Sequence, residues 1–141
     1  MERWIFYAII SMLFAGLTSV LAKFGMKDLS SDTALTFRTG VVFTIVVANA
    51  FLFRNAWTEL SQTSERNLLF LALSGITTSF SWICYYRAMK EGPVSYVASI
   101  DKASIVVTLL LSFLILKEPV TGKILAGAAF ILTGMVILVW K

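Results

Sequence analysis

Residues 94–116 read VSYVASIDKASIVVTLLLSFLIL, a long apolar run that contains one carboxylate and one ammonium, at Asp101 and Lys102. An α-helix rises 1.5 Å per residue, so about 20 residues cross the roughly 30 Å of hydrocarbon in a bilayer. Lipid offers the backbone no hydrogen-bond partners, so a run of this kind is expected to be helical. The run predicts a transmembrane helix whose two charges need a specific reason.

Four similar runs lie elsewhere in the chain, and all five have a length suited to crossing a membrane. The expected spans are residues 4–26, 33–53, 67–89, 94–116 and 120–140. The chain is 58% hydrophobic and 14% charged, whereas a soluble domain has about 25% charged residues. Mean hydropathy is +0.84. The sequence therefore predicts an all-α integral membrane protein with a single transmembrane domain over residues 1–141.

Several other classes of protein are not expected from this composition. A single cysteine, Cys84, excludes an internal disulfide, and the absence of histidine leaves no usual soft-metal site. The formal charge of +4 comes from scattered basic residues, which does not suggest a nucleic-acid surface. No nucleophile–base pair stands out, so we expect neither an enzyme nor a cofactor. Residues 4–26 are too long for the apolar part of a signal peptide and predict a retained span.

The connections between the expected spans are short, which makes consecutive spans antiparallel neighbours. Asp32 is placed to cap the second helix, because its carboxylate can accept from the first free backbone N–H groups. Gly92 is expected to end the third helix and Pro93 to start the fourth.

Lysine and arginine are evenly divided between the two membrane sides that five spans create. The N-terminal side has Arg3, Arg54, Arg66, Lys117 and Lys123, and the opposite side has Lys23, Lys27, Arg87, Lys90 and Lys141. Cytoplasmic loops normally carry the excess, so this count gives no orientation. Either a few flanking residues decide it, or both orientations insert and two copies pair head to tail as an inverted repeat.

Arg38 and Asp101 are expected to lie at a similar depth in the membrane. Arg38 is about six residues into the second span and Asp101 about eight into the fourth, and both spans begin on the same side. A charge at that depth is costly unless it is paired. The two opposite charges therefore predict an Arg38–Asp101 contact, either permanent or released during transport.

Asp101 and Lys102 are about 100° apart on a helix, which makes them poor partners for each other. Lys102 is then expected to reach the interface or a polar cavity. We interpret Arg38, Asp101 and Lys102 together as the polar boundary of a cavity, with a purely structural ion pair as the alternative.

The third span carries hydroxyl and aromatic residues at helical spacing. Thr78, Trp82 and Tyr85 can share one face, which would suit an amphipathic or cationic ligand. Helix packing, with hydroxyls bonded back to their own backbone, is the alternative. In the first span, small residues end in Lys23, which favours either close packing or a cavity with Lys23 at its edge.

The fifth span carries Gly127 and Gly134 on one face. Glycines in this arrangement allow helices to approach closely. The face is expected to pack either within the bundle or between subunits.

At these residues the chain resembles a known family. The stretches are LFAGLTSVLAKFGMK (residues 13–27), FRTG (residues 37–40) and, most specifically, LKEPVTGKILAGAAFILTGMVIL (residues 116–138). They are similar to the EamA branch of the drug/metabolite transporter superfamily, across nearly the whole chain. Most members carry two five-span repeats of opposite topology, so this chain resembles the short form with one EamA repeat. The resemblance implies transport of small metabolites and makes an antiparallel dimer the natural assembly.

The expected function is secondary transport of a small-molecule substrate, inward or outward, by a homodimer or by a heterodimer with a similar short chain. The expected location is the plasma or inner membrane of a bacterium or archaeon. A flippase-like subunit for a lipid-linked polar head group, or a non-transporting accessory subunit, are alternatives. The candidate substrate-binding residues are Arg38, Asp101, Lys102, Trp82, Tyr85 and Lys23.

Overall fold

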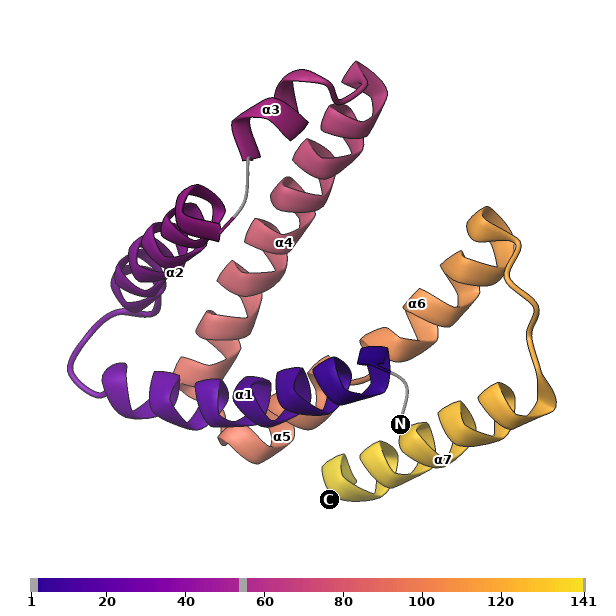
Figure 1. Cartoon of the computed structure of the whole chain (residues 1–141). Helices are drawn as coiled ribbons and strands as arrows, with labels where there is room; N and C mark the ends of the chain where they lie inside the picture. Colours follow the sequence, from indigo (N-terminus) through magenta and orange to yellow (C-terminus); the bar gives the residue numbers. More distant parts are fainter. Residues whose placement is uncertain (1–2, 54–55, 141) are drawn as a thin grey trace. The chain divides into compact units, whose positions relative to one another are not determined.

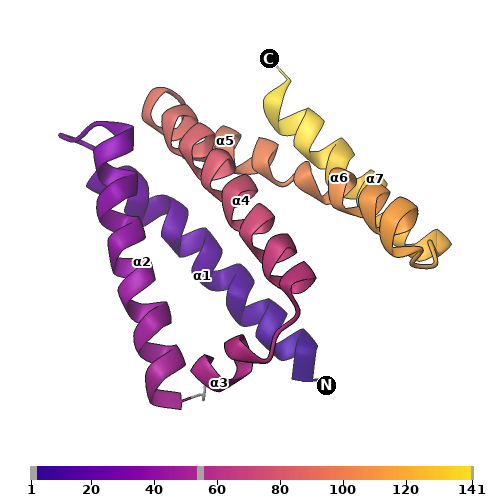
Figure 2. The same ribbon diagram turned by 90° about the horizontal axis from the view of Figure 1, so that it is seen from above.

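The computed structural model describes residues 3–53 and 56–140, and all regular structure within them is helical (Figures 1 and 2). The α-helices are α1 (Arg3–Gly25), α2 (Ser31–Phe53), α3 (Ala56–Ser61), α4 (Glu65–Glu91), α5 (Val94–Asp101), α6 (Ser104–Leu111) and α7 (Gly122–Val139), with a π-helical turn η1 (Ser112–Leu116) after α6. The predicted all-α class is confirmed.

Five helical segments are long and apolar enough to span a membrane. They are α1, α2, α4, the segment Val94–Leu116 and α7, each close to the bounds expected from the sequence. The short helix α3 lies in the longer connection between α2 and α4, where no element was expected. Arg54 and Lys141, which enter the charge count, lie outside the described residues.

The chain divides into two compact units, residues 20–90 and residues 1–19 with 91–141. The first contains the end of α1 together with α2, α3 and nearly all of α4. The second contains the start of α1 together with α5, α6, η1 and α7. The expected single domain over residues 1–141 stays a prediction.

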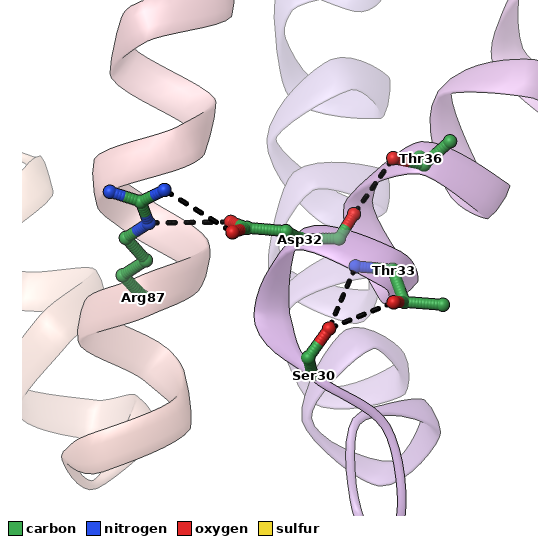
Figure 3. A network of polar contacts seen from close by, with 5 residues as sticks. All are labelled: Ser30, Asp32, Thr33, Thr36 and Arg87. Carbon is green, nitrogen blue, oxygen red and sulfur yellow. Dashed lines mark hydrogen bonds and ion pairs between the residues drawn. The ribbon is translucent and has the colours of Figure 1, made fainter.

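The start of α2 differs from the expectation, because Ser30 and not Asp32 caps the helix (Figure 3). The Thr33 N–H donates to the Ser30 hydroxyl oxygen at 3.1 Å, and the Ala34 N–H donates to the Ser30 carbonyl at 3.0 Å. This is the bonding of an N-cap residue. Asp32 lies in the first turn, where a negative charge still stabilises the helix dipole, and its carboxylate is free to reach α4.

The α4–α5 connection agrees with the sequence prediction. Helix α4 ends at Glu91, and Pro93 precedes α5 in an extended conformation with φ −65° and ψ 137°. Proline lacks an N–H and fixes φ, so it suits the position before a helix.

The fourth span, residues 94–116, is interrupted at its two charged residues, Asp101 and Lys102. Helix α5 ends at Asp101 and α6 begins at Ser104. The Ala103 N–H donates to the Ile100 carbonyl at 2.9 Å and the Ile105 N–H to the Lys102 carbonyl at 3.2 Å. Bonds three residues apart mark a 3₁₀ turn between two α-helices. The expectation of one uninterrupted helix through Asp101 and Lys102 is therefore wrong.

The unit of residues 20–90 holds the buried hydrophobic residues of the described chain. They are Met26, Leu35, Tyr86 and Met89. Most other large apolar side chains are exposed, for example Phe130 at 78%. A membrane helix bundle has no need to hide these groups, because lipid tails are as apolar as the side chains themselves.

Candidate functional site

A groove of about 810 Å³ is lined by residues of α2 and α4, the two helices labelled in Figure 1. Its α2 wall extends from Asp32 to Phe43 and its α4 wall from Ser74 to Arg87. The hydroxyl residues lining it are Thr36, Thr39, Ser74, Thr78 and Ser79. Gly40 and Gly75 also line it, and nothing lies within 4 Å of the place where a Cβ would stand on either glycine. The groove is therefore mainly apolar, with hydroxyl groups along both walls, and it lies within two membrane spans.

Three of the five hydroxyls that line this groove bond back to their own helices. Thr36 Oγ1 donates to the Asp32 carbonyl at 2.8 Å, Thr78 Oγ1 to the Ser74 carbonyl at 2.8 Å, and Ser79 Oγ to the Gly75 carbonyl at 2.9 Å. This is the arrangement given above as the alternative to a ligand-facing role. A hydroxyl that donates in this way keeps lone pairs on its oxygen. The walls can therefore still accept hydrogen bonds from a ligand.

An ion pair between Asp32 and Arg87 lies at one end of the groove (Figure 3). Arg87 Nη2 is 3.2 Å from Asp32 Oδ2, and Arg87 Nε is 3.3 Å from Asp32 Oδ1. Two parallel N–H···O bonds are the preferred arginine–carboxylate geometry. Both side chains are 61% exposed, so the pair orients the ends of α2 and α4 more than it stabilises them.

Arg38 contacts two aromatic rings of α4. Its Cζ lies 4.4 Å from the centroid of the Trp82 ring and 5.8 Å from that of Tyr86. Within the described residues, its buried Nη1 has no hydrogen-bond partner. Trp82 also lines the groove, so Arg38 lies next to a groove residue. Two residues predicted separately, Arg38 and Trp82, are brought together by the structure.

Tyr86 is the functional candidate that sequence reasoning missed. It is only 4% exposed, and its buried hydroxyl has no hydrogen-bond partner within the described chain. The predicted residue Tyr85 packs against it edge to face, with ring centroids 6.5 Å apart. A four-residue spacing from Trp82 leads to Tyr86, whereas a three-residue spacing leads to Tyr85. Extending the four-residue step from Thr78 through Trp82 would have found it.

Asp101 and Lys102 pair with each other, contrary to the sequence-based expectation. Lys102 Nζ lies 3.4 Å from Asp101 Oδ2, with side chains 67% and 39% exposed. The expectation assumed a regular helix, in which adjacent residues diverge. The helix ends at Asp101, and the long lysine stem is flexible enough to bring the ammonium back to the carboxylate.

The Arg38–Asp101 contact would join a residue of one unit to a residue of the other, and it stays a prediction. Asp101 and Lys102 as substrate-binding residues likewise stay predictions.

Lys23 and Lys90 cap the ends of each other's helices. Lys23 Nζ donates to the carbonyl of Met89, and Lys90 Nζ donates to the carbonyl of Met26 at 2.6 Å. Weaker contacts follow, to the carbonyls of Lys90 at 3.4 Å and Lys27 at 3.3 Å. Carbonyls at a helix C-terminus lack partners within the helix, and a cation there also suits the helix dipole. Lys23 thus has a structural role, and its proposed contact with substrate stays a prediction.

The residues around the groove are suited to binding rather than to breaking bonds. They offer hydroxyl oxygens, an aromatic face, a neutralised ion pair and one guanidinium that lacks a carboxylate partner within the described residues. Over residues 3–53 and 56–140, no three histidine, cysteine, aspartate or glutamate side chains gather as a possible metal site.

Comparison with known proteins gives the family. The chain matches the model of the EamA-like transporter family over residues 2–140. It is 40% identical over 137 residues to a Sinorhizobium protein named "Uncharacterized transporter in cobO 3'region", covering 97% of this chain and 96% of that protein. No solved structure matches the chain significantly. With five helices suited to crossing a membrane, the chain is a multi-pass membrane protein that belongs to the EamA-like transporter family.

Proposed function

We propose that the chain is one subunit of a dimeric secondary transporter that moves small metabolites across the plasma or inner membrane of a bacterium or archaeon. The observation that carries the proposal is the groove between α2 and α4, which places hydroxyl oxygens and an aromatic face inside two membrane spans. Polar groups within the membrane normally face a substrate path or a neighbouring helix.

A second copy would complete the transport path. Alternating access in many transporters comes from two repeats of opposite topology that rock around a site at their interface. One five-span chain supplies one such repeat, and its open groove would then face the partner. The face of α7 is compatible with this assembly, because no atom beyond the helix's own neighbouring backbone lies within 4 Å of a Cβ built on Gly127 or Gly134, which leaves room for a partner helix. Asp101 and Lys102 would bound the polar part of the same cavity, with Tyr85 beside its aromatic wall and Lys23 at its edge.

Filling the groove tests the proposal. Gly40→Leu and Gly75→Leu each place a side chain in open space of the groove, so the fold should tolerate them. Leucine also forms helices more readily than glycine. The variants are reconstituted in liposomes, and the rate of metabolite exchange is measured by mass spectrometry. We expect this rate to fall at least about tenfold in each groove variant, which corresponds to ~1.4 kcal/mol in the barrier to transport.

Gly16→Leu is the matched control, because Gly16 is also unobstructed but does not line the groove. Unchanged exchange in both groove variants would contradict the proposal. Movement of a fluorescent lipid head group instead of metabolites would favour the flippase-like alternative. If the unaltered protein moves neither lipids nor metabolites, the result would favour the non-transporting accessory subunit.

A further inference from the structure

We infer that Arg38 and Tyr86 form a receptor for a single carboxylate group, carried by the molecule that occupies the α2–α4 groove. The inference rests on the proposed function only in taking that molecule to be the transported one. It assigns a ligand chemistry to a pair of residues, of which one was not suspected from the sequence.

The first argument is the unsatisfied state of Arg38. Within the described residues it makes no hydrogen bond and no ion pair, and its Nη1 is buried. The Trp82 ring at 4.4 Å attracts the cation, but a ring face supplies no oxygen to accept the N–H groups. A guanidinium within a membrane span normally has a counter-charge or a bonded acceptor. A negatively charged acceptor is therefore the kind of group that this guanidinium would bind.

The second argument is that Tyr86 lacks a partner at the same place. Its hydroxyl is buried and unbonded in a residue that is 96% buried, and its ring lies 5.8 Å from Arg38 Cζ. Buried polar atoms in native proteins are bonded in the large majority of cases, so two neighbouring exceptions call for an explanation. Both are hydrogen-bond donors, and a carboxylate has two oxygens with which to accept them.

The charge of the ligand group follows from local neutrality. The nearby cation Arg87 is already neutralised by Asp32, which leaves one positive charge at Arg38. A monoanion balances it, whereas a phosphate dianion would leave a net negative charge in a medium where isolated charges are costly. A neutral amide or alcohol would leave the guanidinium uncompensated.

Trp82 relates the carboxylate position to the groove. Its ring contacts Arg38 and is also one of the groove walls. A molecule whose carboxylate is bound by Arg38 can therefore place its body against Trp82 and the hydroxyl oxygens of Thr39 and Thr78. These oxygens are acceptors, so they would suit a donor elsewhere on the molecule.

Binding of paired probes tests the inference. The full chain is placed in phosphatidylcholine nanodiscs, and binding of acetate, butyrate and 3-phenylpropanoate is compared with that of the corresponding amides by thermal shift and calorimetry. Inorganic phosphate is a further probe, and nanodiscs containing phosphatidylglycerol offer a monoanionic lipid head group. We expect at least one carboxylate to bind about tenfold or more tightly than its amide, as charge-assisted hydrogen bonds should allow.

Three variants locate the site. Arg38→Gln should abolish the preference for carboxylate over amide. Tyr86→Phe should weaken carboxylate binding by about tenfold, while the melting temperature without ligand stays the same or rises, because the lost hydroxyl had no partner. Tyr96→Phe removes a phenol hydroxyl in the other unit and should leave binding unchanged.

Several results would overturn the inference. They are equal binding of every carboxylate and its amide, unchanged binding in Tyr86→Phe, tighter binding of inorganic phosphate, or displacement of carboxylates by phosphatidylglycerol. A permanent partner in Asp101 would also overturn it, and would appear as equal loss of melting temperature in Arg38→Gln, Asp101→Asn and the double variant. If metabolites are exchanged but carboxylates bind no better than amides, the carboxylate receptor is refuted and the proposed transport is not. If carboxylates bind but no metabolite is exchanged, the proposed transport is refuted and the carboxylate receptor is not.

Discussion

At the scale of residues, four basic side chains in the unit of residues 20–90 show three kinds of partner for a positive charge. Arg87 bonds a carboxylate, Lys23 and Lys90 bond backbone carbonyls, and Arg38 lies over aromatic rings. The first three lie near helix ends, where carbonyls and loop residues are available as partners. Arg38 lies inside its helix, where only side chains can supply them. That difference in location explains why the candidate site is at Arg38.

The reciprocal lysine caps give a prediction about stability. Lys23→Met and Lys90→Met each keep an apolar stem but remove the ammonium that bonds the neighbouring helix end. Hydrogen bonds from charged groups contribute more than neutral ones, so each variant should lose about 1–2 kcal/mol. Thermal unfolding of the purified protein in detergent measures the loss.

Lys27→Met is the matched control for these caps, because Lys27 is exposed and contributes only its carbonyl to the cap. An equal loss of stability in the control and in the two cap variants would contradict the structural role of Lys23 and Lys90.

At the scale of elements, the fourth span shows that an apolar run can predict a membrane span without predicting a break within its helix. The run of residues 94–116 contains no glycine or proline, so nothing in its pattern predicts a break. The structure nevertheless has a 3₁₀ turn at residues 102–103, directly after Asp101. Short 3₁₀ segments inside helices often act as hinges. The turn lies at the charged pair that is proposed to bound the cavity.

Hydrogen exchange provides a test of this interruption. The amides of Ala103, Ile105 and Val106 bond carbonyls three residues back, in a geometry weaker than that of an α-helix. In nanodiscs we expect them to exchange about tenfold or more faster than the amides of residues 128–134 in α7, which corresponds to local opening easier by ~1.4 kcal/mol. Equal protection of the two segments would indicate a continuous fourth helix.

Helix starts were only partly readable from the sequence. Pro93 before α5 behaved as expected, whereas Ser30 took the capping position that Asp32 had been assigned. Serine and aspartate are equally good caps, so local chemistry does not choose between them when they lie two residues apart. Asp32 instead accepts hydrogen bonds from Arg87 of α4, so its carboxylate is used away from the helix start.

At the scale of the whole molecule, the even division of basic residues bears on assembly. On the topology expected from five spans, each side of the membrane would receive five, and the usual excess that fixes orientation would be missing. An antiparallel dimer of a single chain requires both orientations to insert.

A reporter fused to the C-terminus tests dual orientation. We expect a reporter that works only in the cytoplasm and one that works only outside it each to give about half of its full activity, because neither side has a charge advantage. Adding two lysines beside Arg3 should shift activity strongly to one reporter and abolish assembly of the dimer, measured by cross-linking. Activity of one reporter alone in the unaltered chain would instead favour pairing with a different short chain.

The sequence by itself determined the class of protein, the five spans and their approximate ends, because lipid requires long apolar helices whose backbone bonds are internal. It also identified Arg38 and Trp82 as candidates, since polar groups are conspicuous within apolar runs. Tertiary structure alone decided the partners: Trp82 and Tyr86 for Arg38, Asp32 for Arg87, and neighbouring carbonyls for Lys23. Partners depend on how helices distant in sequence are rotated and placed against each other, and hydropathy does not encode that rotation.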